Sequence, residues 1–284
     1  MIFLRSLLTQ DKLMRTIVAL PVIISVISWN EAEANEDYKK SIKTLETTGS
    51  CQACNFLMAE MRGIDIKGAN LSGAILREAN LKKANLVGAN FTDADLRRAS
   101  FEKADLATSI FDGAQLRGTD FEKATVPKGK FRNADIRSAD FRSTDIKEAD
   151  FSNSDIRGAI FNRANAELAS FQGAKLSGAS FERANLIAAN LKSARLNELN
   201  MNRVNATEAR FDGSDLRNTY FTSSDLTNAS FKNTQLSGVL IRRSRLAGAD
   251  FTGATGIESV QFIDSCRDEA TILPSSIQMQ LCTD

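Results

Sequence analysis

The sequence predicts an all-β solenoid, in which the chain winds as a four-sided coil around an apolar core. Three observations predict it. A large apolar residue recurs every five positions, a small residue precedes it by two, and phenylalanine recurs every ten. In register, residues 69–88 read ANLSG AILRE ANLKK ANLVG, and this phase holds without a slip over 37 centres from Leu71 to Phe251. A fixed-period repeat decides the architecture before any other pattern does.

A period of five fits neither a helix nor a flat strand. On a helix, five residues advance about 500°, which scatters the large residues over the whole surface. On a strand, an odd spacing places successive large residues on opposite faces. Within one pentad, however, the small residue and the centre are two apart and share a side. We therefore expect short extended sides joined by corners, with every centre inside.

The phenylalanines indicate how many sides one coil has. Phe recurs every ten residues from Phe91 to Phe181, and Leu, Ile or Val fills the alternate centres with one exception, Ala166. A four-sided coil, with one pentad to a side, sorts these rings into two vertical stacks on opposite sides. The first stack holds Phe91, Phe111, Phe131, Phe151 and Phe171, and the second holds Phe101, Phe121, Phe141, Phe161 and Phe181.

The A(D/N)LXX pentads resemble the pentapeptide-repeat family over roughly two thirds of the chain. The resemblance implies a right-handed quadrilateral β-helix, here of about nine coils of four pentapeptides. A solenoid exposes apolar cross-section and unpaired backbone at its ends, so we expect a short helical cap at each end. The Asn or Asp before many centres, as in Asn70, Asn80 and Asp95, is expected to hydrogen-bond the backbone at corners and not to act in catalysis.

The chain divides into four predicted segments. Residues 1–34 are typical of a secretory signal, because basic residues precede a 14-residue apolar stretch and an A-x-A pattern. That stretch is shorter than the roughly 20 residues of a membrane span, and an uncleaved anchor is the alternative. Residues 35–55 form an N-terminal helical cap with a CxxC motif, residues 56–255 the β-helix, and residues 256–284 a C-terminal helical cap.

Each cap has its own local signals. Over residues 36–48, Tyr38, Ile42 and Leu45 share one helical face. After the repeats, Ser265 and Asp268 resemble a capping box that opens a short helix to about Leu273, followed by a second one through Leu281.

The four cysteines lie near the two ends of the repeat. Cys51 and Cys54 precede the pentads, and Cys266 and Cys282 bracket the predicted C-terminal helices. Haem attachment would need a histidine, and the chain has none. One four-cysteine zinc site would join ends about 40–45 Å apart, far beyond the zinc–sulfur bond length of about 2.3 Å. We expect a Cys266–Cys282 disulfide in a C-terminal lid.

For Cys51 and Cys54, a structural role and a thiol–disulfide redox role both remain open. The CQACNF stretch just ahead of the pentads resembles exported members of the family from cyanobacteria and plastid lumens, which often carry a CxxC there. This resemblance favours a structural pair.

Folding the sequence at four pentads per coil arranges the outward basic residues in two lines. One holds Arg77, Arg97, Arg117, Arg137, Arg157 and Arg217, and the other, on the adjacent side, holds Lys83, Lys103, Lys123, Arg163, Arg183, Arg203 and Arg243. Asp95, Asp135, Asp155 and Asp215 precede members of the first line by two, and Glu102, Glu122 and Glu182 adjoin the second. The lines are either a charge-compensated solvent surface or a binding surface for a polyanion or an acidic protein.

The sequence favours a non-enzymatic exported scaffold or protein-interaction rod, in the periplasm or the thylakoid lumen. No histidine, nucleophile elbow or phosphate-binding glycine loop occurs, so we expect no catalysis, cofactor or metal. The alternatives are a redox protein using Cys51 and Cys54 and, from the resemblance, a DNA-mimicking gyrase modulator. A net charge of +1 and the basic lines disfavour nucleic-acid mimicry. We expect an unknown protein or polyanion partner, no nucleic acid, membrane contact only through residues 1–34, and leave a homodimer open.

Overall fold

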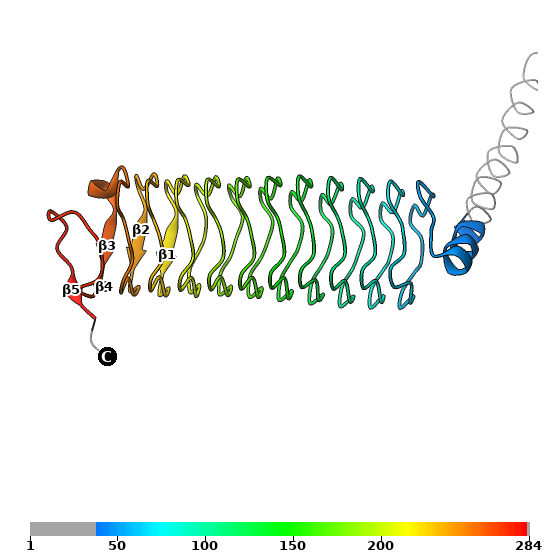
Figure 1. Ribbon diagram of the computed structural model, residues 1–284, viewed down its shortest axis with the longest axis horizontal. Helices are drawn as coiled ribbons and strands as arrows, with labels where there is room; N and C mark the ends of the chain where they lie inside the picture. The colour runs from blue at the N-terminus through cyan, green and yellow to red at the C-terminus, as the bar shows by residue number, and fades with distance from the viewer. Residues whose placement is uncertain (1–37, 283–284) are drawn as a thin grey trace, which may run out of the picture.

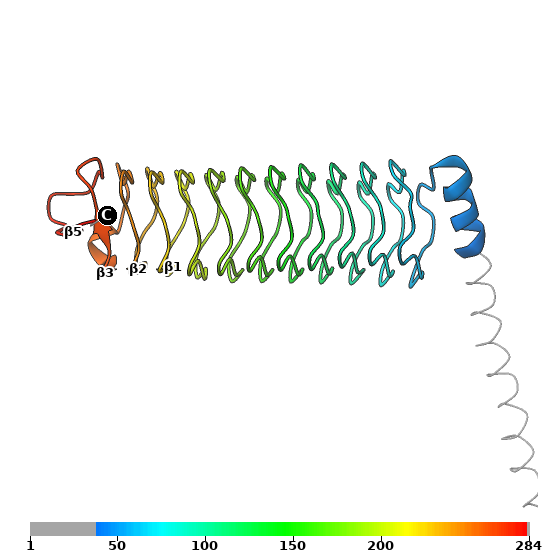
Figure 2. The ribbon, with the colours of Figure 1, turned by 90° about the horizontal axis from the view of Figure 1, so that it is seen from below.

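The computed structural model describes residues 38–282, which form one rod of stacked coils with a helix at one end (Figures 1 and 2). In each pentad, the residue before the centre forms a parallel β-bridge with its counterpart four pentads later, beginning with Ser50 and Asn70, and a new ladder starts at each of the first four pentads. Four ladders therefore run along the rod, one on each side of a four-sided coil. The predicted signal, residues 1–34, lies outside the described residues.

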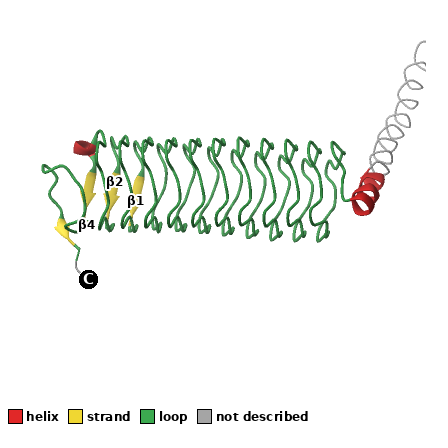
Figure 3. Cartoon of the chain, viewed as in Figure 1, coloured by secondary structure: helices red, strands yellow, loops and turns green. Residues whose placement is uncertain are grey.

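Regular strands are short and lie at the C-terminal end of the rod (Figure 3). Elsewhere each side contributes one bridging residue before the chain turns, so the coil is a β-structure without long strands. β1, β2 and β3 form a parallel three-stranded sheet, and β4 pairs with β5 in parallel. The elements are the N-terminal helix at residues 38–48, β1 Tyr220–Thr222, β2 Leu240–Arg242, the 3₁₀ helix η1 Ile257–Ser259, β3 Gln261–Ile263, β4 Cys266–Arg267 and β5 Gln280–Leu281.

One pentad, residues 71–75, shows how the five-residue unit satisfies its backbone. The N–H groups of Leu71, Gly73 and Ile75 donate to carbonyls of neighbouring coils at 2.8–2.9 Å. The N–H of Ala74 donates to the carbonyl of Leu71 at 3.1 Å and closes the turn. The remaining N–H, on Ser72, donates to Oδ1 of Asn70 at 3.2 Å. Every N–H of the unit thus has an acceptor, and the expected role of the Asn or Asp before the centre is confirmed.

The third residue of this turn lies in the left-handed region of backbone conformation, with φ of 65° at Gly73. A turn of this type requires a positive φ there, which glycine and asparagine adopt most readily. The same position in other pentads carries long side chains, including Lys83 at 58° and Arg163 at 61°.

The core is a column of apolar side chains that fills the coil. All 37 predicted centres are buried. The two expected phenylalanine stacks are confirmed: Phe131 lies parallel to Phe111 and Phe151, with ring centroids 4.7 and 4.5 Å apart. It meets Phe121 of the opposite stack edge-on at 6.0 Å. Parallel stacking along the rod and edge-on contact across it are both favourable geometries for aromatic pairs.

The solenoid begins earlier than the sequence reading placed it. Cys51, Phe56, Met61 and Ile66 are buried at the same phase as the later centres, and the ladders start at Ser50 rather than after residue 55. One ladder makes ten steps of four pentads between Ser50 and Asp250, so the estimate of nine coils was too low. The residues that precede these early centres include Cys54 and Ile64, which obscured the repeat.

The N-terminal helix lies across the first coil, as Figures 1 and 2 show. Its Leu45 is buried in the core, and the hydroxyl of Tyr38 donates to the carbonyl of Glu60 at 2.8 Å. The helix thus covers apolar side chains that an open end of the coil would expose to water.

The predicted C-terminal helices were wrong, because this segment continues the ladders as β4, β5 and connecting loops. The N–H of Cys266 donates to the carbonyl of Ser244, and Leu246 donates to Cys266. The Ser265 hydroxyl donates to the carbonyl of Ile241 and does not cap a helix. The open edge of the last coil supplies partners for these backbone groups, and this tertiary pairing overrides the local capping pattern.

Replacing Phe131 with alanine should lower the free energy of unfolding by about 3–5 kcal/mol, because it leaves a cavity between two stacked rings. Chemical denaturation measures the change. As a control, Leu168→Gly should be neutral or slightly stabilising, because Leu168 is half exposed at φ 60°. A loss for Leu168→Gly as large as that for Phe131→Ala would contradict this account of the core.

Candidate interaction surface

The two basic lines lie on successive corners of the coil, so one side of the coil lies between them. Arg77 is the second residue of one four-residue turn and Lys83 the third residue of the next. The expectation that the lines occupy adjacent sides is therefore corrected. We call this side and its two corners the basic side. Its central outward column is Asn80, Ser100, Asp120, Asp140, Ile160, Ser180, Asn200, Tyr220 and Leu240.

On the first corner, most arginines form ion pairs with an aspartate two residues earlier. Arg97 donates from Nε and Nη2 to the two carboxylate oxygens of Asp95 at 2.7 and 2.6 Å. The hydrogen bonds from Arg97 hold the pKa of Asp95 below its ordinary value. The same arrangement recurs at Arg137, Arg157 and Arg217 with Asp135, Asp155 and Asp215.

The first corner also carries two arginines without an ion pair inside residues 38–282, namely Arg77 and Arg117. The residues two positions before them are Ile75 and Gln115, which supply no charge. These guanidinium groups remain available to an external anion.

On the second corner, the glutamates expected beside the line also form ion pairs. Lys103 contacts Glu102 at 2.6 Å, Lys123 contacts Glu122 at 2.7 Å, and Arg183 lies 3.8 Å from Glu182. Lys82 reaches Glu102 from the neighbouring coil at 2.9 Å. Lys83, Arg163 and Arg203 have no ion pair within the described chain. The charge-compensated interpretation therefore holds for part of each line only.

Two cations that were not predicted as part of this surface, Lys175 and Arg195, lie beside the first corner. They occupy the column in which other coils carry the paired aspartates, and together with Arg157 and Arg217 they line a shallow surface depression. Arranging every outward position in columns, one row to a coil, and not only the arginine positions, would have found them.

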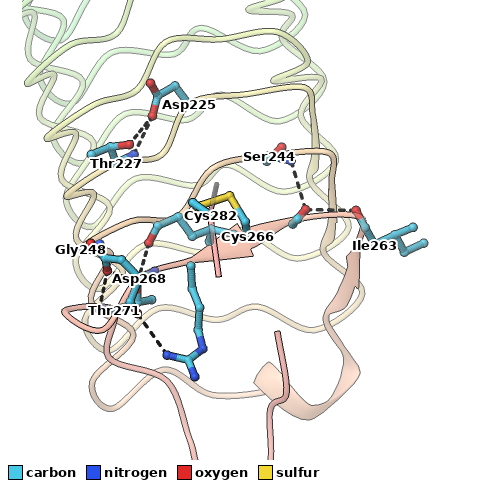
Figure 4. The surroundings of a disulfide bond; sticks show 12 residues. Asp225, Thr227, Ser244, Gly248, Ile263, Cys266, Asp268, Thr271 and Cys282 are labelled. Carbon is cyan, nitrogen blue, oxygen red and sulfur yellow. Dashed lines mark hydrogen bonds between the residues drawn. A yellow bond between two sulfur atoms is a disulfide. The ribbon is translucent and has the colours of Figure 1, made fainter. Parts of the chain in front are cut away.

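The four cysteines form two disulfides, Cys51–Cys54 and Cys266–Cys282. Cys51 stands at a centre and Cys54 at the following small position, so the first bond spans one corner, where the N–H of Cys54 donates to Cys51. The second joins Cys266 of β4 to Cys282, which directly follows β5. It lies beside Asp268, whose Oδ1 accepts from the N–H groups of Gly248 and Thr271 (Figure 4).

Within residues 38–282, no group of three or more His, Cys, Asp or Glu side chains is placed to hold a metal ion. No helix in that same range has the length and apolar character needed to cross a bilayer.

Two family models match the chain. The model of pentapeptide repeats matches overlapping segments within residues 51–186, and the model of a pentapeptide repeat region matches residues 174–251. The chain therefore belongs to the pentapeptide repeat family, whose solved structures have a right-handed quadrilateral β-helix. No curated protein matched the chain.

Several solved structures are similar to the chain. HetL, involved in heterocyst differentiation regulation in the cyanobacterium Nostoc sp. strain PCC 7120, is 24% identical with a TM-score of 0.43, over 82% of this chain and 96% of that one. QnrB1, a plasmid-mediated fluoroquinolone resistance protein, is 18% identical with a TM-score of 0.40, over 74% and 94%. A pentapeptide repeat protein of the Arabidopsis thaliana thylakoid lumen is 31% identical with a TM-score of 0.29, over 32% and 67%.

The two lysines beside Glu102 lower the pKa of its carboxyl group to about 2, chiefly through hydrogen bonds from Lys103 and Lys82. This pair of contacts therefore stabilises the rod fully above about pH 4.5 and is lost as the pH falls through about 2. Replacing both lysines with methionine should return the Glu102 pKa toward 4.5, measured by NMR titration of the carboxyl carbon. An unchanged pKa in that variant would contradict the assignment.

Replacing Cys266 and Cys282 with serine should lower the free energy of unfolding by about 3 kcal/mol, because the bond closes a long loop. The matched variant without Cys51 and Cys54 should lose less, about 2 kcal/mol, because that loop has only four residues. Denaturation under non-reducing conditions compares the two. A larger loss of free energy of unfolding for the Cys51–Cys54 variant would contradict this account, because loop length would then not explain the contribution of that bond.

Proposed function

We propose that the protein is a non-enzymatic exported scaffold, a rigid rod that binds a partner protein through its basic side. The observation that carries the proposal is that the inward side chains of each coil only fill the core, whereas its outward side chains face solvent. Every centre from Cys51 to Phe251 is buried among apolar neighbours, so the described coils use their interior for packing alone. The side chains whose charge and polarity differ from coil to coil occupy the outward positions. On the basic side, several of them are cations that have no ion pair within the described residues.

Export is supported by the signal pattern of residues 1–34 together with two disulfides. Disulfides persist in oxidising compartments and are rare in the cytosol. The periplasm and the thylakoid lumen are the compartments that this proposal names.

The two alternatives have less support. A redox role for Cys51 and Cys54 needs an accessible sulfur, whereas Cys51 is only 3% exposed at a core position and Cys54 is partly buried against the core. A DNA-mimicking gyrase modulator needs an acidic rod, whereas this chain has a net charge of +1 and two of its outward lines are basic. The similarity to QnrB1, at the identity and TM-score given above, adds no argument for that activity.

Affinity capture tests the proposal, with the mature chain (residues 35–284) as bait in an extract of the exported compartment. The variant Arg117→Glu, Arg163→Glu, Arg203→Glu should lose the proteins that the natural sequence captures, because it reverses unpaired cations on both corners. A matched variant of the opposite side, Lys130→Glu, Arg210→Glu, Lys232→Glu, should keep them.

Two results would contradict the scaffold proposal. One is equal capture by both variants, which would place the interaction elsewhere on the rod. The other is the absence of any protein captured by the natural sequence in repeated extracts. A mixed disulfide trapped on Cys51 in a Cys54→Ser variant would instead favour the redox alternative.

A further inference from the structure

The basic side has two chemically different halves. From Arg77 to Ser143, its corners and central column carry ten bases, four of them lysine, interleaved with five acids. From Arg157 to Arg243, they carry seven bases, all arginine, and two acids. We call these the lysine half and the arginine half. Their net charges are equal, so total charge does not distinguish them.

Internal pairing distinguishes them in proportion: within the described residues, three of seven bases lack an ion pair in the arginine half and three of ten in the lysine half. Of the ten bases in the lysine half, Arg77, Lys83 and Arg117 alone have no ion pair within the described residues. In the arginine half the unpaired bases are Arg163, Arg203 and Arg242. Among these six, Arg242 alone has a buried Nε without a hydrogen-bond acceptor. A buried donor without an acceptor is destabilising.

The backbone of the second corner also indicates selection for a cationic side chain. Between residues 83 and 243, the left-handed position holds Gly or Asn repeatedly on the other three corners and never on this one. In the arginine half it holds Arg163, Arg183, Arg203 and Arg243 at φ of 49–61°. A side chain in this conformation costs on the order of 1 kcal/mol relative to glycine. Such strain tends to persist where the side chain serves a function.

The central column of the arginine half adds apolar contacts. Ile160 and Tyr220 are exposed large side chains, and Leu240 lies beside Tyr220 where β1 pairs with β2. The same column in the lysine half reads Asn80, Ser100, Asp120 and Asp140. Arginine and tyrosine are enriched at protein–protein interfaces, whereas lysine and aspartate are depleted.

We propose, building on the scaffold function above, that the arginine half binds an acidic segment of the partner protein laid parallel to the rod. Arg163, Arg183 and Arg203 take carboxylates, and Ile160 and Tyr220 contact apolar side chains between them. Arginine recognises a carboxylate through two parallel hydrogen bonds, which lysine does not. An anionic membrane surface fits less well, because net charge alone would draw it equally to the lysine half.

The spacing of the arginines favours a helical partner. Arg163, Arg183 and Arg203 stand on successive coils, so their backbones are about 4.8 Å apart along the rod. One turn of an α-helix rises about 5.4 Å, whereas residues on the same face of an extended strand repeat every ~6.6 Å. Carboxylates on successive turns of one helix face therefore match the row more closely.

The test measures fluorescence anisotropy of a labelled helical peptide with Glu on successive turns of one face and Leu beside them. The mature chain should bind it. Arg163→Asn, Arg183→Asn, Arg203→Asn should weaken binding at least about tenfold, since each removes a charge-assisted contact. The matched variant Lys82→Asn, Lys103→Asn, Lys123→Asn removes the same charge from the lysine half, where these lysines are already ion-paired, and should change binding less than about twofold.

Stability separates a binding role from a structural one. Asparagine is favoured at left-handed positions, so the arginine-half variant should melt no lower than the natural sequence while binding is lost. Equal weakening by the two variants would overturn the proposal, because attraction would then follow total charge.

Two further results separate this inference from the scaffold function. Binding of phosphatidylglycerol vesicles without binding of the peptide would overturn it in favour of a membrane surface. Failure of both probes while proteins are still captured from the extract would also overturn it and leave the scaffold function standing. Peptide binding that depends on the arginine half supports it even where extract capture fails.

Discussion

The chain must turn a corner every five residues without leaving a backbone N–H unpaired, and the rest of the structure depends on this constraint. In the pentad of residues 71–75, three N–H groups reach neighbouring coils, one closes the turn, and the last is accepted by the side chain of Asn70. The solution fixes the period, the polar residue before most centres and the left-handed residue that follows two positions after a centre. It also fixes which side chains enter the core, because the turn points the centre and the small residue inward.

Different constraints therefore act on the inward and the outward positions. The inward positions are filled by packing, as the alternating phenylalanine stacks show. The outward positions are free to vary, and they stay in register because each ladder returns to the same side at every fourth pentad. Charged residues that recur at every fourth pentad therefore form a line along one side of the rod. The two halves of the basic side show that one line can carry ion-paired and unpaired cations on different coils.

Much of this arrangement could be predicted from the sequence, because it follows from one repeated local rule. The four-sided coil, the phenylalanine stacks and the pairing of Asp95 with Arg97 all follow from counting in pentads and in groups of four pentads. The C-terminal segment could not be predicted in this way. Its capping signals around Ser265 are local, whereas the open edge of the last coil, which determines the outcome, is formed by residues far earlier in the chain. The buried Nε of Arg242 likewise depends on packing that no spacing rule describes.

The four-sided repeat also limits how such a chain can change in length. Loss or gain of a single pentad would rotate everything downstream by a quarter turn, so the corners carrying Arg117 and Arg217 would no longer belong to one side. Loss or gain of four consecutive pentads would shorten or lengthen the rod by one coil and keep every column aligned. Surface patterns on this rod can therefore be inherited intact only through whole-coil duplication or deletion, which makes the coil the unit of evolutionary change.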